Sequence, residues 1–301
     1  MDRRFVTLDV FTRQRLKGNP LAVVLDSAGL EDARMQAIAA EFNLSETVFV
    51  TPPAEPRHRA AMRIFTPGSE LPFAGHPTIG TAVLLALRAG ADNGFDGAQA
   101  FALEQRAGLV ACVAEPIEPG AVGRARFRAP GLPRVTHDAA DSAAVAAALG
   151  LSPRDIGFAG HAPSAWGVAK GFAFAPVASL AALGRITPDA AAIRAITPAD
   201  HAAIFAYAQV DMELTFRARM FAPGLGIAED PATGSAVASL AGALMQYEPL
   251  GDGVHDVTVI QGVEMGRESR IALQMTIEQG RLISVEIGGE AVIVSEGTLR
   301  L

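Results

Sequence analysis

The hydrophobic positions of this chain fall in short runs, and most of these runs have the residue types of β-strands. Aliphatic, β-branched and aromatic residues gather in brief segments that glycine, proline or polar clusters separate. In the first half this pattern predicts strands over residues 5–10, 21–25, 47–50, 60–65, 101–104, 109–113 and 124–127. In the second half it predicts strands over 166–174, 214–221, 257–260, 271–277, 282–287 and 291–294.

Fewer segments show the helical period. Residues 30–42 place Met35, Ile38 and Phe42 on one face, and the alanine-rich segment 139–149 ends at Gly150, a residue type that favours helix ends. Because strands do not simply alternate with helices, the pattern predicts the α+β class.

An internal repeat divides the chain into halves. Arg63-Ile-Phe-Thr-Pro-Gly68 in the first half corresponds to Arg219-Met-Phe-Ala-Pro-Gly224 in the second. After a gap that differs by two residues, His76-Pro-x-x-Gly80 corresponds to Asp230-Pro-x-x-Gly234. His76 and Asp230 lie 154 positions apart in a chain of 301 residues. We infer a duplicated domain, in which each copy supplies a strand, a loop and a helix.

Each copy of the repeat runs into a stretch of small and aliphatic residues, 81–89 and 235–245, without a charged face. A helix that is apolar all round is a buried helix, so each half is predicted to wrap its sheet around one central helix. The N-terminal ends of two such helices, facing each other across a cleft, would suit a small anionic ligand such as a carboxylate. A single loop of this kind is an ordinary tight turn, but the duplication favours a ligand site.

The loops before the two predicted helices supply the candidate site residues. Gly75 and Gly234 would let a ligand approach the backbone closely, and His76 and Asp230 are polar residues at matching places. Glu46 is a further candidate, because a carboxylate at the edge of an apolar strand tends to gain a raised pKa and suits general acid–base chemistry. On local sequence alone, the pattern favours a surface or turn carboxylate at Glu46 over a catalytic one.

Composition excludes several classes of function. One cysteine, Cys112, excludes an internal disulfide framework and any mechanism that needs two thiols in one chain. The formal charge of −7 without a basic block argues against a nucleic-acid partner. The six histidines show no metal-ligand spacing, so no metal site is expected. The apolar runs are too short to span a membrane, and no signal peptide is recognisable, so we expect a cytoplasmic protein with no membrane partner.

These motifs resemble the PhzF family of phenazine-biosynthesis-like isomerases. The resemblance rests on segments in the family's order along nearly the whole chain. They are Gly18-Asn-Pro-Leu-Ala-Val23, Asn43-Leu-Ser-Glu-Thr47, Phe65-Thr-Pro67, Glu70-Leu-Pro-Phe-Ala-Gly-His-Pro77, Glu229-Asp-Pro-Ala-Thr-Gly-Ser-Ala236 and Gln261-Gly-Val-Glu-Met-Gly-Arg267.

The resemblance implies a diaminopimelate-epimerase-like fold with two pseudo-symmetric domains, each a sheet wrapped around a central helix. We expect an N-terminal domain over residues 1–120, completed by the C-terminal strand 291–301, and a second domain over 121–290. It also implies a homodimer and a reaction without a cofactor. The diaminopimelate epimerases use a pair of cysteines. This chain has one cysteine, Cys112, which lies in a predicted core strand, so that mechanism is excluded.

By the same resemblance, Glu46 is the catalytic acid–base group, and His76 and Asp230 orient the substrate and relay protons. Gly75, Gly234 and Ser235 supply backbone and hydroxyl contacts to a small substrate that carries a carboxylate and an amino group. The leading hypothesis is therefore a cofactor-independent isomerase that moves a proton between two positions of such a metabolite. The alternatives are an amino-acid racemase or epimerase acting at one α-carbon, and a metabolite-binding protein without catalysis.

Overall fold

The computed structural model describes residues 2–93, 97–168, 170–198, 202–211 and 213–301, and its chain divides into two compact units. Unit 1 comprises Met1–Arg128 and Gly288–Leu301, and unit 2 comprises Ala129–Ile287. The sequence analysis set the boundaries after residues 120 and 290. Each unit is described by itself below.

The strands of unit 1 close into a ring. Successive pairings run β1–β2–β3–β4–β6–β7–β8–β17 and return to β1, so the sheet has no free edge along this path. The pairs β2–β3 and β4–β6 are parallel. The strands are β1 (Arg3–Val10), β2 (Asn19–Val24), β3 (Glu46–Thr51), β4 (Ala60–Phe65), β5 (Glu70–Leu71), β6 (Gln99–Gln105), β7 (Gly108–Glu118), β8 (Val122–Arg128) and β17 (Arg281–Leu299), which belongs to unit 1 from Gly288 onward.

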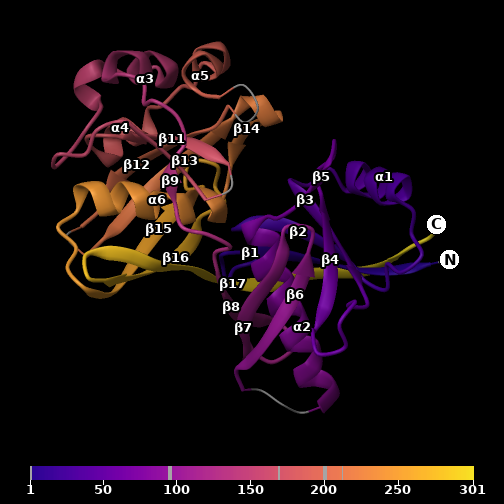
Figure 1. The fold of residues 1–301 in the computed structure, drawn as a ribbon. Coiled ribbons are helices and arrows are strands. Elements are labelled where there is room, and N and C mark those ends of the chain that lie inside the picture. Colours follow the sequence, from indigo (N-terminus) through magenta and orange to yellow (C-terminus); the bar gives the residue numbers. More distant parts are fainter. Residues whose placement is uncertain (1, 94–96, 169, 199–201, 212) are drawn as a thin grey trace. The chain divides into compact units, whose positions relative to one another are not determined.

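Helix α2 (Gly75–Asn93) lies on one face of these strands and helix α1 (Asp32–Phe42) on the other. α2 contacts β1, β2, β3, β7 and β8 (Figure 1), and most of its described residues are buried. α1 packs Met35 and Ile38 against the outward-facing Val24, Phe49 and Phe65 of β2, β3 and β4. The unit thus encloses α2 as its central helix.

Unit 2 repeats this arrangement with its own strands. Hydrogen-bonded pairs run β9–β10–β11–β12–β13, and β13 also pairs with β14 and, in parallel, with β15, which pairs with β16. The strands are β9 (Arg134–Val135), β10 (Ser164–Gly167), β11 (Gly171–Pro176), β12 (Ile204–Gln209), β13 (Thr215–Ala222), β14 (Ile227–Asp230), β15 (Gly253–Gln261) and β16 (Ser269–Glu278).

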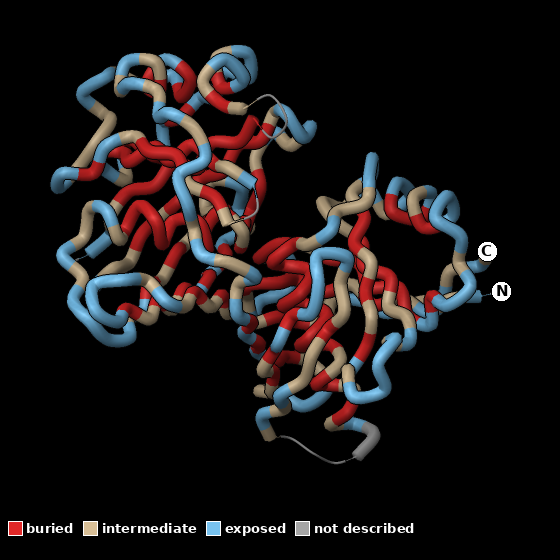
Figure 2. Tube along the Cα trace, in the orientation of Figure 1, coloured by how far each residue is buried: buried red, intermediate tan, exposed pale blue. Residues whose placement is uncertain are grey.

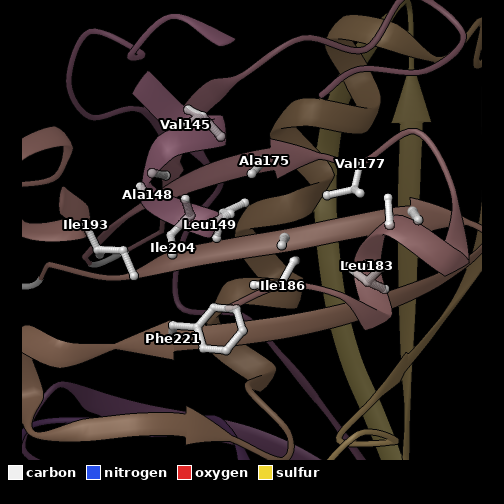
Figure 3. Packing of buried hydrophobic residues seen from close by; sticks show 14 residues of the cluster. Val145, Ala148, Leu149, Ala175, Val177, Leu183, Ile186, Ile193, Ile204 and Phe221 are labelled. Carbon is white, nitrogen blue, oxygen red and sulfur yellow. The ribbon is translucent and has the colours of Figure 1, made fainter. Parts of the chain in front are cut away.

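Two hydrophobic layers hold unit 2 together. Helix α6 (Gly234–Tyr247) contacts β9, β10, β11 and β16, and is buried for most of its length. On the other face of the sheet lie α3 (Ser142–Leu149), α4 (Leu180–Gly184) and α5 (Ala190–Ile196), whose Leu149, Leu183 and Ile193 pack on Ile204 and Phe221 (Figure 3). Short 3-10 turns at Pro153–Asp155 and Pro223–Leu225 complete the unit.

The strand pairings confirm the duplication that the sequence predicts. β1 to β7 correspond in order to β10 to β16, and α2 corresponds to α6. In both units the second and third strands are parallel, the third and fourth antiparallel, and the fourth pairs in parallel with the sixth. This two-fold repeat of sheet and central helix is the predicted α+β, epimerase-like architecture.

Most predicted elements are present, but several have other limits than predicted. The helix predicted over 81–89 is α2, which begins at Gly75, so the Pro-x-x-Gly segment of unit 1 is helical and is not the predicted loop. Within 166–174 lie parts of two antiparallel strands, β10 and β11, which pair Gly167 with Gly171. Residues 282–287 and 291–294 belong to one continuous strand, β17, because the glycines between them do not interrupt it. The helix predicted to end at Gly150 does so, with Gly150 in the left-handed conformation at φ 66°.

Burial follows this organisation within each unit. Buried residues run along the strands and the central helices, and exposed residues along the connecting loops (Figure 2). Within the described ranges, no helix combines the length and apolar character that crossing a membrane requires.

Candidate functional site

Glu46 is the first residue of β3, just after α1 ends at Asn43 in the left-handed conformation. It pairs with Leu21 of the parallel strand β2, so its backbone is held by the sheet. The Glu46 side chain is 14% exposed, so it is mostly shielded from solvent. A strand end within a sheet is a rigid mounting for an acid–base group.

His76 lies in the first turn of α2 and faces Glu46. Its Nε2 is 3.5 Å from Oε2 of Glu46, beyond direct hydrogen-bond length but within reach of a small side-chain adjustment. Burial of the imidazole lowers the pKa of His76 to about 3, although a hydrogen bond to the backbone of Pro20 partly opposes this effect. His76 is therefore neutral at physiological pH.

The bond to Pro20 determines which nitrogen of His76 carries the hydrogen. Proline has no N–H, so its backbone can only accept, and the imidazole must donate. Nε2 makes no hydrogen bond to a described residue, so the donor is Nδ1. In a neutral imidazole the other nitrogen is then an acceptor. Nε2 thus presents a lone pair to Glu46 and would accept a proton shared by a protonated Glu46 carboxyl.

Asp230 ends β14 in unit 2 and is buried, with 6% of its surface exposed. Its Oδ2 accepts a hydrogen bond of 2.6 Å from the hydroxyl of Thr233. Thr233 is the N-cap residue of α6, yet its side chain does not cap the helix. The hydroxyl that would ordinarily stabilise the helix start is instead directed at the Asp230 carboxylate.

Gly234 and Ser235 are the first residues of α6, and Gly75 and His76 are the first residues of α2. The first N–H groups of a helix have no acceptor inside it and carry partial positive charge. Each unit therefore brings a helix start and one predicted polar residue together, His76 in unit 1 and Asp230 in unit 2. Glu46 joins His76 in unit 1, and joint action of the two groups on one substrate stays a prediction.

Glu46 has no acidic counterpart in the repeat. In unit 1, Phe65 of the repeated motif pairs with Thr47, and in unit 2 the corresponding Phe221 pairs with Ile204. The position before Ile204 is Ala203, which is buried and matches Glu46. The duplicated fold therefore carries a carboxylate at this strand position in unit 1 and an alanine in unit 2.

The repeated arginines have a structural role that sequence reasoning did not assign. Arg63 Nε and Nη2 donate to the two carboxylate oxygens of Glu70, at 2.7 and 2.8 Å. Arg219 makes the same two-pronged contact with Glu229, at 2.9 and 2.8 Å. Each guanidinium also lies over the phenylalanine two residues later. These pairs fasten β5 and β14, the short strands that lead into the two helix starts.

Cys112 is a core residue, as predicted. It lies in β7, is 3% exposed, and burial raises the pKa of its thiol to about 12. Among the described residues no group of three or more histidine, cysteine, aspartate or glutamate side chains is placed to hold a metal ion.

The sequence analysis did not single out Gln261, the last residue of β15, which contacts a candidate site loop. Its fully buried side chain contacts the loop between Asp230 and Thr233. It lies inside the Gln261–Arg267 segment that carries part of the family resemblance, but nothing in the spacing predicted a contact with Asp230.

The chain is similar to known proteins over nearly its whole length. A family model described as PhzC-PhzF, phenazine biosynthesis-like protein, matches residues 8–297. An uncharacterized isomerase of Mesorhizobium japonicum is 46% identical, over 99% of this chain and 98% of that protein. A trans-2,3-dihydro-3-hydroxyanthranilate isomerase of Pseudomonas aeruginosa is 36% identical, over 98% of each chain.

Solved structures show the same fold. A phenazine biosynthesis protein of Bacillus anthracis, of the PhzF family, superposes with a TM-score of 0.85 at 26% identity, covering all of both chains. A hydroxyproline epimerase of Agrobacterium vitis superposes with a TM-score of 0.67 at 12% identity, covering 99% of this chain and 92% of that one. The second likeness concerns the fold alone.

Proposed function

The chain belongs to the phenazine biosynthesis-like family of isomerases, and from this we propose that it moves a proton between two positions of a small metabolite bearing a carboxylate and an amino group. Glu46 removes the proton and returns it, without a cofactor. His76 and Asp230 orient the substrate, and the N–H groups at Gly75, Gly234 and Ser235 hold its carboxylate. The relatives' substrate, trans-2,3-dihydro-3-hydroxyanthranilate, is the first compound to test.

The contact between Glu46 and His76 carries this proposal. A carboxylate that takes a proton from carbon must hold it until the second carbon is ready. His76 offers a lone pair on Nε2 3.5 Å from Oε2, so the protonated carboxyl gains a hydrogen-bond acceptor at the stage when it needs one. Proton transfer by a positioned group contributes roughly 10²- to 10⁴-fold in rate.

Deuterium incorporation tests the proposal directly. The protein is incubated with the dihydro-hydroxyanthranilate substrate in D₂O, and the product is examined by mass spectrometry and proton NMR. We expect isomerised product from the wild type and a loss of roughly 10²-fold or more in rate for Glu46→Gln, which keeps the shape but cannot accept the proton. Glu41→Gln, a change at an exposed position of α1, is the matched control and should react as the wild type does.

Equal turnover by the wild type and Glu46→Gln would show that Glu46 is not the acid–base group. Substrate-dependent thermal stabilisation without any product or exchange would instead favour the binding-protein alternative. Thermal stabilisation by other small acids that carry one amino and one carboxylate group would then define the class of ligand.

A racemase that acts at one α-carbon remains the second candidate, since the fold is shared with a hydroxyproline epimerase. Such enzymes need two opposed acid–base groups, and Ala203 occupies the repeat position that matches Glu46. Asp230 or His76 would have to serve as the second group. Loss of optical rotation of an amino acid, abolished by Asp230→Asn as well as by Glu46→Gln, would favour this reading.

We also propose a homodimer, which sedimentation equilibrium can test.

A further inference from the structure

We propose that Gln261 and Thr233 are positioning residues, which fix the direction of the Asp230 carboxylate through a chain of hydrogen bonds. The inference rests on the proposed function, in which Asp230 holds the substrate. Thr233 and Gln261 touch Asp230 from two directions, one from the start of α6 and the other from the end of β15. All three side chains are buried, with 8%, 0% and 6% exposed for Thr233, Gln261 and Asp230.

The backbone determines how the Gln261 amide is oriented. The N–H of Thr233 can only donate, and it bonds to Oε1 of Gln261 at 3.1 Å. The carbonyl of Asp230 can only accept, and it takes a hydrogen bond of 2.7 Å from Nε2. Both contacts require the same orientation of the amide, so Nε2 is the donor toward the loop.

This orientation in turn directs the Thr233 hydroxyl. Nε2 of Gln261 lies 3.0 Å from Oγ1 of Thr233 and donates to it. The hydroxyl has one hydrogen, and its remaining close partner is Oδ2 of Asp230, at 2.6 Å. The chain therefore runs from Gln261 through Thr233 to Asp230 in one direction. A hydrogen bond donated to a carboxylate stabilises its ionised form and its orientation.

A tight approach of two backbones makes this chain possible. Gly262, next to Gln261, has a φ of 75°, and a Cβ at that position would lie 2.7 Å from the carbonyl oxygen of Pro231. Glycine thus lets the end of β15 come against the Asp230–Thr233 loop, which brings the Gln261 side chain within reach.

The other half of the repeat contains a similar anchor, made by the matching glutamine with a threonine at a different repeat position. Gln105 ends β6, the strand that corresponds to β15, and its Nε2 donates to the hydroxyl of Thr78 at 2.9 Å. The Thr78 hydroxyl donates to the backbone carbonyl of Ala74. A glutamine that ties a strand end to a threonine at the helix start therefore occurs in both units. Only in unit 2 does the threonine donate to a candidate site residue.

The first test measures the ionisation of Asp230 itself. Protein labelled with ¹³C at the aspartate carboxyl carbons is titrated by NMR, and the Asp230 signal is assigned as the one missing from Asp230→Asn. Thr233→Val removes the donor while keeping the shape, so its Asp230 signal should titrate at higher pH than in the wild type. Thr233→Ser keeps the hydroxyl and should restore the wild-type position. Gln261→Met, which removes the Nε2 donor without adding charge, should shift the titration in the same direction by less.

An unchanged titration in Thr233→Val overturns the inference, whatever the enzyme activity shows. The control is Thr197→Val, which removes another buried hydroxyl of unit 2, bonded to the carbonyl of Ile193. It should lower the melting temperature without moving the Asp230 signal.

The second test uses turnover of the dihydro-hydroxyanthranilate substrate in a double-mutant cycle. Thr233→Val should lower kcat/KM by about 10- to 100-fold, mainly through KM, as expected for loss of a hydrogen bond to a charged group. In the Asp230→Asn background the same change should cost less than about 3-fold, because the partner is already altered. An equal loss in both backgrounds would show a general structural effect and overturn the inference. Full activity of Asp230→Asn would instead remove Asp230 from the proposed function, while the titration still decides the hydrogen-bond chain.

Discussion

His76 differs from an exposed histidine because the fold keeps its imidazole away from water. The ring is buried at the start of α2, donates Nδ1–H to Pro20 and turns Nε2 toward Glu46. His76 therefore places no positive charge beside Glu46 at neutral pH. A neutral acceptor suits a carboxyl group that gains and loses a proton, whereas an imidazolium would favour the ionised carboxylate throughout.

The first prediction concerns the pH dependence of stability. The pKa of His76 falls from its usual 6.5 to about 3 in the folded protein, so the unfolded chain binds the additional proton at intermediate pH. Stability from this group is present above pH 6.5 and is lost as the pH falls toward 3. Between pH 7 and pH 5 the loss should be about 2 kcal/mol.

Chemical denaturation at pH 7 and pH 5 measures this loss. His76→Asn removes the titrating group, so its free energy of unfolding should fall by about 2 kcal/mol less than the wild type's between the two pH values. The carboxylates whose pKa values the fold lowers, such as Glu70, contribute mainly below this interval. An identical fall in both proteins would mean that His76 is not held neutral by burial.

At the scale of elements, each central helix depends on close contact with the strands around it. In α6, Gly242 lies against the ring of Trp166 from β10, and a Cβ on Gly242 would come within 2.5 Å of the ring atom Cδ2. In α2, Gly80 lies in the same way against Leu21 of β2. Small residues in these helices therefore allow strands to pack directly on the helix backbone.

Gly242→Ala sets helix propensity against this contact. Alanine favours a helix over glycine by about 1 kcal/mol, but overpacking a rigid aromatic ring costs about 1–3 kcal/mol or more. We expect a net loss of about 1–2 kcal/mol, measured as a lower free energy of unfolding. Gly251→Ala is the control, because nothing lies within 4 Å of a Cβ there, and its effect should stay within about 0.5 kcal/mol. A stabilised Gly242→Ala would show that Trp166 moves aside easily.

The elements that the sequence predicted well are those with a local pattern. α6 was predicted because its apolar run is continuous, and β4 because aliphatic and aromatic residues gather in a short run. β12 was missed because all but its last residue is buried, which leaves no alternation to detect. The turn between β10 and β11 was missed because aromatic residues continue on both sides of it.

The candidate site shows even more clearly that local sequence patterns do not predict tertiary contacts. Glu46, His76 and Asp230 were chosen from motifs and from the repeat, without knowledge of their neighbours. The Glu46–His76 contact depends on where α2 enters the ring of strands, and the Gln261–Thr233 contact joins residues 28 positions apart. Such contacts follow from tertiary structure, and no local periodicity encodes them.

At the scale of the whole molecule, the chain leaves unit 1 and returns to it. β17 supplies its last residues to unit 1, where Ala291 pairs with Val10 and Leu299 with Arg3. Without this return, β1 would lose its partner on one side and the ring of unit 1 would open. The duplication is thus complete in topology only when the C-terminal segment joins the N-terminal strand.

This connection predicts that a destabilising substitution near the C-terminus also destabilises the N-terminal strands. Ala291 in β17 is fully buried, so Ala291→Asp places a carboxylate in the core of unit 1, at a cost of several kcal/mol. In hydrogen exchange by mass spectrometry, β1 and β2 should lose protection, while β12 and β13 lose less. Ala206→Asp, at an equally buried position of β12, should give the reverse pattern. If both variants expose the same strands, the two units do not open separately, and the free energy of unfolding belongs to the whole chain.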